Sequence, residues 1–200
     1  MFLTENPHCA SGVYNLSGGI LGWNHITVSD LPKFMIFDAG REEASLADLL
    51  MDGMNLERGA SRFYTSVLAK HPEAAFARPI ELLARAEEGH ARLLYSFWIK
   101  EQTDPPAFEE IYENLSGDIV EGGQTVDELV ARLGEFSGDA CLDIVEMALS
   151  VEFAAYDLYR AMAHRYCNTK MEEPFLAIAQ AEKEHMRIAS EALRFCEYSA

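Results

Sequence analysis

Two segments of this chain repeat each other at a constant offset of 95 residues, and this repeat limits the possible folds more than any other feature. The offset relates three pairs of potential metal ligands: Glu57 and Glu152, Glu87 and Glu182, His90 and His185. Four further pairs share it: Ala60 and Ala155, Tyr64 and Tyr159, Pro79 and Pro174, Arg92 and Arg187. A repeat of this kind indicates one structural unit that is used twice.

Each repeat contains a Glu-x-x-His motif within an apolar helical pattern. Glu182 and His185 are three residues apart and therefore share one helix face, the face that also carries the apolar stripe. A buried carboxylate needs a compensating partner, because uncompensated buried charge is costly. A third match, Glu5 with His8, lies around Pro7 in a polar stretch without helical periodicity, and we exclude it.

The spacing of the repeat predicts two helical hairpins. Pro72 lies midway between the single glutamate and the motif of the first segment, where a turn is expected. Asn168, which suits the end of a helix, lies near the corresponding midpoint of the second segment. Antiparallel helices joined at these turns bring each single glutamate level with the motif of its partner helix. Two hairpins side by side would then place four glutamates and two histidines at one height in a bundle.

That set of side chains has a known metal chemistry. One Glu from each of two helices, with Glu-x-x-His from each of the other two, is the ligand set of ferritin-like di-iron and di-manganese proteins. Carboxylates and imidazoles suit first-row divalent metals. Four carboxylates balance the charge of two divalent cations, which explains how such a cluster can be buried.

Residues Leu46 to Phe195 resemble the ferritin-like domain of the rubrerythrins. The resemblance implies an all-α, ferritin-like four-helix bundle with a long crossover between its second and third helices. It implies two Fe ions, which Mn or Zn could replace, held by Glu57, Glu87, His90, Glu152, Glu182 and His185. Tyr64 and Tyr159 resemble tyrosines that the family places beside these ligands; the alternative is that they only fill the core.

The sequence departs from the rubrerythrins in two ways. The family usually carries an extra Glu three residues after the third-helix Glu, where this chain has Ala155; the symmetric position is Ala60. We therefore expect the metal pair to keep its positions between oxidation states. The four cysteines form no Cys-x-x-Cys pair, so no rubredoxin module is indicated. Electrons would come from an external donor such as a rubredoxin-like protein.

Three functions fit these observations. The first is an enzyme, a di-iron peroxidase or oxidase that reduces hydrogen peroxide or dioxygen and works as a homodimer. The second is a ferroxidase that handles iron for storage, which would need a large cage. The third is a non-enzymatic, metal-binding bundle whose polar residues are structural.

The composition predicts a soluble, cytoplasmic protein. The net charge of −17 argues against nucleic acid as a partner. No apolar run is long enough to cross a membrane, and the first residues do not resemble a signal peptide. Four scattered cysteines do not form a disulfide framework, so we expect a reducing compartment.

The chain is expected to contain a ferritin-like domain over residues 41–200, preceded by an extension over residues 1–40. Long helices are predicted near 42–70, 73–103, 138–167 and 170–198, with short helices at 107–115 and 125–134 in the connection between the hairpins. The segment from Val13 to Asn24 resembles the closing strand and Gly-Gly turn of a rhodanese-like domain. Forty residues are too few for that domain, so we expect a remnant and assign no catalytic role to Cys9.

Overall fold

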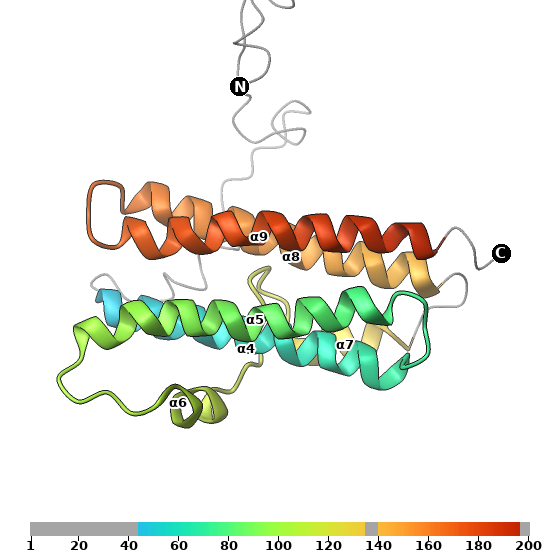
Figure 1. Ribbon diagram of the computed structural model, residues 1–200, viewed down its shortest axis with the longest axis horizontal. Coiled ribbons are helices and arrows are strands. Elements are labelled where there is room, and N and C mark those ends of the chain that lie inside the picture. The colour runs from blue at the N-terminus through green and yellow to red at the C-terminus, as the bar shows by residue number, and fades with distance from the viewer. Residues whose placement is uncertain (1–43, 135–139, 197–200) are drawn as a thin grey trace, which may run out of the picture. The chain divides into compact units, whose positions relative to one another are not determined.

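The computed structural model describes residues 44–134 and 140–196, and this part of the protein is all-α, as the sequence predicts. The four long helices, labelled as in Figure 1, are α4 (Leu46–Lys70), α5 (Ala77–Trp98), α8 (Ala140–Arg165) and α9 (Glu172–Ala192). Two 3-10 turns extend α5 and α9: η1 (Ile99–Glu101) and η2 (Leu193–Phe195). No helix of the described part is both long and apolar enough to cross a membrane.

The chain divides into two units, Met1–Leu31 and Pro32–Ala200, and every described residue belongs to the second. The predictions for the N-terminal extension fall outside the described residues. They are the rhodanese-like segment, the assignment of no role to Cys9, and the domain boundary at residue 40. They stay predictions.

Local chemistry sets the ends of the two hairpins. At the start of α4, the Ser45 hydroxyl accepts a hydrogen bond from the Asp48 amide (3.2 Å), and the Asp48 carboxylate accepts one from the Ser45 amide (3.0 Å). This reciprocal cap satisfies amides that a helix leaves unpaired in its first turn. The helix ends at Lys70, shortly before Pro72, which cannot donate a backbone hydrogen bond. Asn168, in the turn between α8 and α9, adopts a left-handed φ of 63°, which Asn tolerates better than most residues.

The two hairpins pack into a four-helix bundle. Helix α4 packs against α5, and α8 packs against α9. Between the hairpins, α5 packs against α9, the two helices that carry the Glu-x-x-His motifs (Figure 1). The arrangement confirms the expected topology and brings the two motifs face to face.

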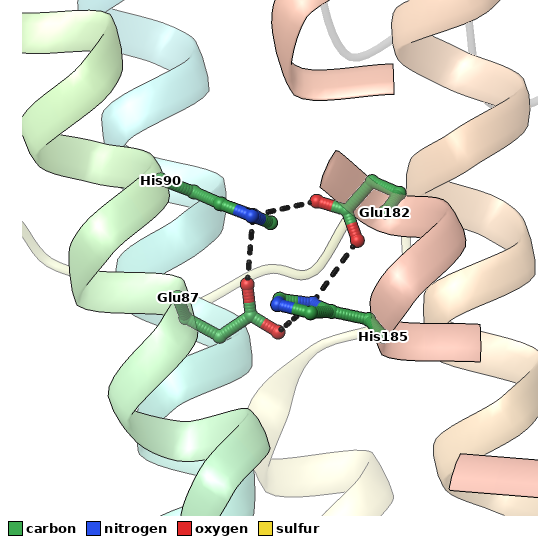
Figure 2. A group of neighbouring side chains, drawn as sticks. All are labelled: Glu87, His90, Glu182 and His185. Carbon is green, nitrogen blue, oxygen red and sulfur yellow. Dashed lines mark ion pairs between the residues drawn. The ribbon is translucent and has the colours of Figure 1, made fainter. Parts of the chain in front are cut away.

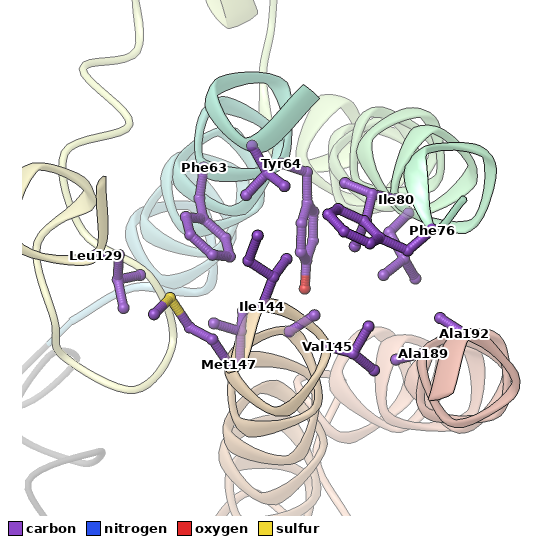
Figure 3. Close-up of a cluster of buried hydrophobic side chains, with 14 of the residues drawn as sticks. Phe63, Tyr64, Phe76, Ile80, Leu129, Ile144, Val145, Met147, Ala189 and Ala192 are labelled. Carbon is purple, nitrogen blue, oxygen red and sulfur yellow. The ribbon is translucent and has the colours of Figure 1, made fainter. Parts of the chain in front are cut away.

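Two apolar clusters hold the bundle together, one on each side of the polar centre. On α4, the first cluster uses residues that follow Glu57, including Phe63 and Val67, and the second uses residues that precede it, including Leu50 and Met54. Figure 3 shows the first cluster, with side chains from α4, α5, α8 and α9 meeting in the interior. Each fully buried side chain of this size contributes about 1.5–3 kcal/mol. The clusters therefore fix the helices on both sides of the level where the glutamates lie.

The crossover connection, residues 102–139, contains two short helices, α6 (Phe108–Asn114) and α7 (Val126–Arg132), close to their expected positions. Thr125 and Glu128 form a capping box at the start of α7. Between α6 and α7 the chain makes a narrow loop that reaches toward the space between the two hairpins (Figure 1).

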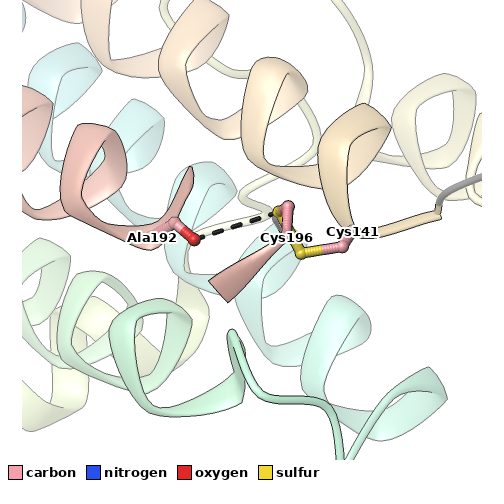
Figure 4. Close-up of a disulfide and its surroundings, with 3 residues drawn as sticks. All are labelled: Cys141, Ala192 and Cys196. Atoms are coloured by element: carbon pink, nitrogen blue, oxygen red, sulfur yellow. Dashed lines mark hydrogen bonds between the residues drawn. A yellow bond between two sulfur atoms is a disulfide. The ribbon is translucent and has the colours of Figure 1, made fainter. Parts of the chain in front are cut away.

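A disulfide joins Cys141 in the first turn of α8 to Cys196 just after η2 (Figure 4). Their Cα atoms are 5.3 Å apart, within the normal range for a disulfide. The expectation that the cysteines would not form a disulfide was therefore wrong for this pair. The physical reason is the hairpin, because its antiparallel helices bring the start of α8 beside the end of α9. Cys167, in contrast, is exposed and free.

Candidate metal centre

The two Glu-x-x-His motifs meet in the middle of the bundle. Figure 2 shows Glu87 and His90 on α5 facing Glu182 and His185 on α9. Each of the four residues offers one ligand atom, and these atoms all lie within 4.8 Å of one another. The two imidazole rings are stacked, with centroids 4.3 Å apart and an angle of 14° between their planes. The spacing of three residues places each pair on one helix face, as the sequence predicts.

The single glutamates of α4 and α8 complete the group. Glu57 Oε2 lies 3.4 Å from His90 Nδ1, and Glu152 Oε2 lies 3.0 Å from His185 Nδ1. His90 is 7% exposed, and the other five residues are 3% exposed or less. The structure therefore brings together all six residues that the sequence singled out.

The carboxylates face the histidines in two different ways. Glu87 directs Oε2 to His90 and Oε1 to His185, each at 3.4 Å from Nδ1. Glu182 directs Oε1 to His90 (2.7 Å) and Oε2 to His185 (3.2 Å). Glu57 and Glu152 each direct one oxygen to a single histidine. The motif glutamates thus span the centre, while the single glutamates lie at its two ends.

Two tyrosines link the hairpins across the site. The Tyr159 hydroxyl on α8 donates a hydrogen bond to Glu57 Oε1 on α4 (2.6 Å). In the opposite direction, the Tyr64 hydroxyl on α4 donates to Glu152 Oε1 on α8. Both tyrosines are fully buried. They pack in the two apolar clusters and also bond to the single glutamates.

Burial and ion pairing divide the carboxyl groups into two kinds. Burial raises the pKa of Glu57 to about 8, although contact with His90 opposes the shift. Burial likewise raises the pKa of Glu152 well above its usual value. For Glu87 and Glu182, burial acts in the same direction, but contacts with both histidines outweigh it and hold the pKa below the usual value.

The same contacts act on the imidazoles. Burial lowers the pKa of His90 and His185, but the surrounding carboxylates outweigh it and raise both well above the usual value of 6.5. Without metal, the centre therefore contains two imidazolium ions beside two ionised carboxylates. For the other two carboxyl groups, Glu57 and Glu152, burial favours the protonated form.

Several polar atoms of the centre lack hydrogen bonds, which tests whether a metal pair fits. His90 Nδ1 lies near three carboxylates, yet it makes no well-directed hydrogen bond to any of them. Glu57 Oε2 and both oxygens of Glu182 are also buried without one. Unsatisfied buried polar atoms are costly, whereas cations at the centre would satisfy all of them. The donor set of carboxylate oxygens and imidazole nitrogens fits a pair of first-row divalent ions.

One buried acidic residue near the centre was missed by the sequence analysis. Glu121, in the crossover connection, is only 1% exposed, and its Oε2 makes no hydrogen bond. Burial, with the charges of Glu57, Glu87 and Glu182, raises its pKa well above the usual value. The sequence gives little sign of this position, because the residue lies outside the repeat and precedes Gly122-Gly123, a pattern typical of an exposed turn.

Comparison with known proteins bears on the second half of the chain. A family model described as Rubrerythrin matches residues 143–199, which include Glu152, Glu182 and His185. No curated protein and no solved structure matches the chain. The family match supports a place among the rubrerythrin and ferritin-like proteins. The family model does not cover Glu57, Glu87 and His90, so their assignment to the site rests on the internal repeat and on the geometry.

Proposed function

We propose that this chain is a di-iron oxidoreductase of the rubrerythrin type, which reduces hydrogen peroxide with electrons from a separate donor protein. The observation that carries the proposal is the convergence of four glutamates and two histidines on one buried centre. The rubrerythrin family match over residues 143–199 supports the same assignment.

The geometry suggests how the residues would share the work. Glu87 and Glu182, whose oxygens face both histidines, would bridge two ions. Glu57 with His90 would hold one ion, and Glu152 with His185 would hold the other, because each single glutamate faces only that histidine. Two iron ions would supply one electron each, and these two electrons with two protons convert hydrogen peroxide into two waters.

The rest of the chain protects and orients this centre. The apolar clusters on both sides exclude bulk water from it. The tyrosine hydroxyls each hold one oxygen of a single glutamate, which leaves the other oxygen directed at a histidine. Such positioning keeps a ligand in one orientation and lowers the cost of ordering it when the metal binds. We further propose that the protein works as a homodimer and that the donor is a rubredoxin-like protein.

The proposal is tested by stopped-flow oxidation of the anaerobic, iron-loaded, reduced protein with each oxidant in turn. We expect hydrogen peroxide to react faster than dioxygen, and repeated turnover only when a donor is supplied. Equal rates with the two oxidants, or ferric mineral inside a large multi-subunit shell, would instead support iron storage. Measurement of the native mass separates a dimer from a cage.

A matched pair of variants links the activity to the centre. Glu182→Ala removes a buried carboxylate that faces both histidines, whereas Glu184→Ala removes an exposed one that pairs with Arg187. Metal occupancy should fall strongly in the first variant and stay unchanged in the second. Equal occupancy in the two variants would favour a purely structural role for the buried cluster.

A further inference from the structure

The crossover connection carries a tight turn that is built into the bundle. Val120 O accepts a hydrogen bond from Gly123 N (2.8 Å), which closes a four-residue turn with Glu121 at its second position. The two arms of the loop are joined by hydrogen bonds from Val120 N to Gln124 O (3.0 Å) and from Val126 N to Asp118 O (2.8 Å). Glu121 therefore lies at the tip of a short hairpin-like loop.

Close contacts fix this loop against α4. A Cβ atom added at Gly59 would lie 2.2 Å from Ile119 O, so the loop backbone can approach the helix only because residue 59 is glycine. Asn55 Oδ1 accepts a hydrogen bond from Gly117 N (3.0 Å), and Arg62 donates to Gly117 O (2.9 Å). The loop is thus held along α4 at the level of Glu57.

The other side of the turn contacts α8. A Cβ atom added at Gly122 would lie 3.5 Å from Ala154 Cβ, which is ordinary van der Waals contact. Ala154 is two residues after Glu152, just as Gly59 is two residues after Glu57. The turn therefore touches both helices that carry a single glutamate, at the same level on each. Glu121 is placed at the height of the metal centre.

The Glu121 carboxyl group has the properties of an unused ligand. Its side chain is buried, and Oε2 makes no hydrogen bond. After burial, the charges of Glu57, Glu87 and Glu182 raise its pKa, and its own charge would raise the pKa of the Tyr64 and Tyr159 hydroxyls; these five groups surround the centre. A buried carboxyl group with an unpaired oxygen destabilises the fold unless something compensates it.

We propose that Glu121 is a fifth carboxylate ligand of the metal pair, supplied by the crossover connection and not by the four long helices. Ala60 and Ala155, three residues after Glu57 and Glu152 on the same helix faces, offer only methyl groups, so neither helix supplies such a ligand. Four carboxylates neutralise two divalent ions. Oxidation of both ions adds two positive charges, and a fifth carboxylate offsets one of them.

This inference rests on the proposed metal centre but not on peroxidase activity, and Zn²⁺ tests it without redox chemistry. In a crystal structure of the Zn²⁺-loaded wild-type protein, we expect a Glu121 oxygen about 2.0–2.2 Å from a zinc ion. By calorimetric titration, Glu121→Gln should bind Zn²⁺ at least about tenfold more weakly than wild type. The control Glu113→Gln, which changes an exposed glutamate of the same connection, should bind as wild type does.

The thermal stability of the metal-free protein distinguishes a ligand role for Glu121 from a purely structural one. Glutamine has the same shape as glutamate and removes a buried acid, so the metal-free Glu121→Gln variant should melt no lower than wild type. The inference is overturned if Glu121→Gln binds Zn²⁺ with wild-type affinity and Glu121 lies more than about 3 Å from both ions in the loaded wild-type structure. That result would leave the proposed metal centre intact. If wild-type protein binds no metal, both proposals fail. If the variant does not fold, the crystal structure of the loaded wild type decides.

Discussion

Binding of two divalent ions at pH 7 should release about five protons, and each proton can be assigned to a residue. Metal ligands bind as ionised carboxylates and neutral imidazoles. His90 and His185 are cationic in the metal-free protein, because nearby carboxylates raise their pKa values well above 6.5. Glu57, with a pKa of about 8, is mostly neutral at pH 7, and burial favours the protonated form of Glu152 as well because it raises that pKa. These four residues supply four protons.

We assign the fifth proton to Glu121, because burial raises its pKa and favours the protonated carboxyl group. Glu87 and Glu182 contribute none, since the histidines hold their pKa values low and they are already ionised. The affinity for metal therefore rises with pH. The overall log K for two ions should increase by about five per pH unit near pH 7, and by about four above pH 8, where Glu57 has already lost its proton.

The assay is calorimetric titration of metal-free protein with Zn²⁺ at pH 7 in buffers that differ in ionisation enthalpy. The dependence of the observed heat on the buffer gives the number of protons released. Glu57→Gln and Glu121→Gln should each release about four protons per two ions, one fewer than wild type. The control Glu184→Gln, at an exposed position, should match wild type. Release of two protons or fewer by wild type would refute the charge assignment, as would an unchanged number in Glu57→Gln.

Two further predictions concern stability. Tyr159→Phe removes a hydrogen bond to Glu57, which is mostly protonated at pH 7 without metal and ionised when metal is bound. Thermal denaturation at pH 7 should therefore show a loss of about 1.5–3 kcal/mol in the loaded protein and a smaller loss without metal. As a control, Tyr95→Phe removes a hydrogen bond from an exposed hydroxyl to Pro106 O, outside the centre. It should lower the stability equally with and without metal. Cys141→Ser removes the disulfide to Cys196, which closes a loop of 55 residues. Urea unfolding should show a free energy of unfolding about 4 kcal/mol lower than that of the oxidised wild type. The difference should disappear when the wild type is reduced.

The repeat predicted most of the fold and the six principal residues of the centre, because their positions follow from the helical period and from distances along the chain to a turn. A spacing of three residues fixes Glu87 and His90 to one helix face, and equal distances from a turn set Glu57 level with them. The same reasoning could have found the disulfide. Cys141 and Cys196 lie almost equally far from the turn at Asn168, as Glu152 and Glu182 do, so the hairpin brings them together.

Glu121 could not be predicted in this way. Its position depends on contacts with Gly59 and Ala154, which are distant in sequence and follow no helical period relative to it. Glycine next to a charged residue normally indicates a solvent-exposed turn. Here the turn instead lies against two helices, and the glycine that permits the close approach is Gly59 on α4. Only the tertiary structure distinguishes these two uses of glycine.

A pair of glycine substitutions tests whether the crossover loop positions the centre. Gly59→Ala would place a Cβ atom 2.2 Å from Ile119 O, so the loop and α4 must move apart. Gly89→Ala, on α5 between Glu87 and His90, meets nothing within 4 Å. The first change should destabilise the protein by about 1–3 kcal/mol and weaken Zn²⁺ binding by displacing Glu121. The second should stabilise α5 by up to about 1 kcal/mol and leave binding unchanged, although it is closer in sequence to the ligands.

The contrast between the two variants separates a local effect on the ligand helices from an effect of the loop. Thermal denaturation measures the stability of each variant, and calorimetry measures its affinity for Zn²⁺. If Gly59→Ala is destabilised but binds Zn²⁺ with wild-type affinity, the loop stabilises the bundle without positioning a ligand. If Gly89→Ala weakens binding as much as Gly59→Ala does, the affinity responds to any change near the centre. Loss of affinity in Gly59→Ala alone supports the inference that the crossover loop, which carries Glu121 62 residues beyond that glycine, forms part of the metal centre.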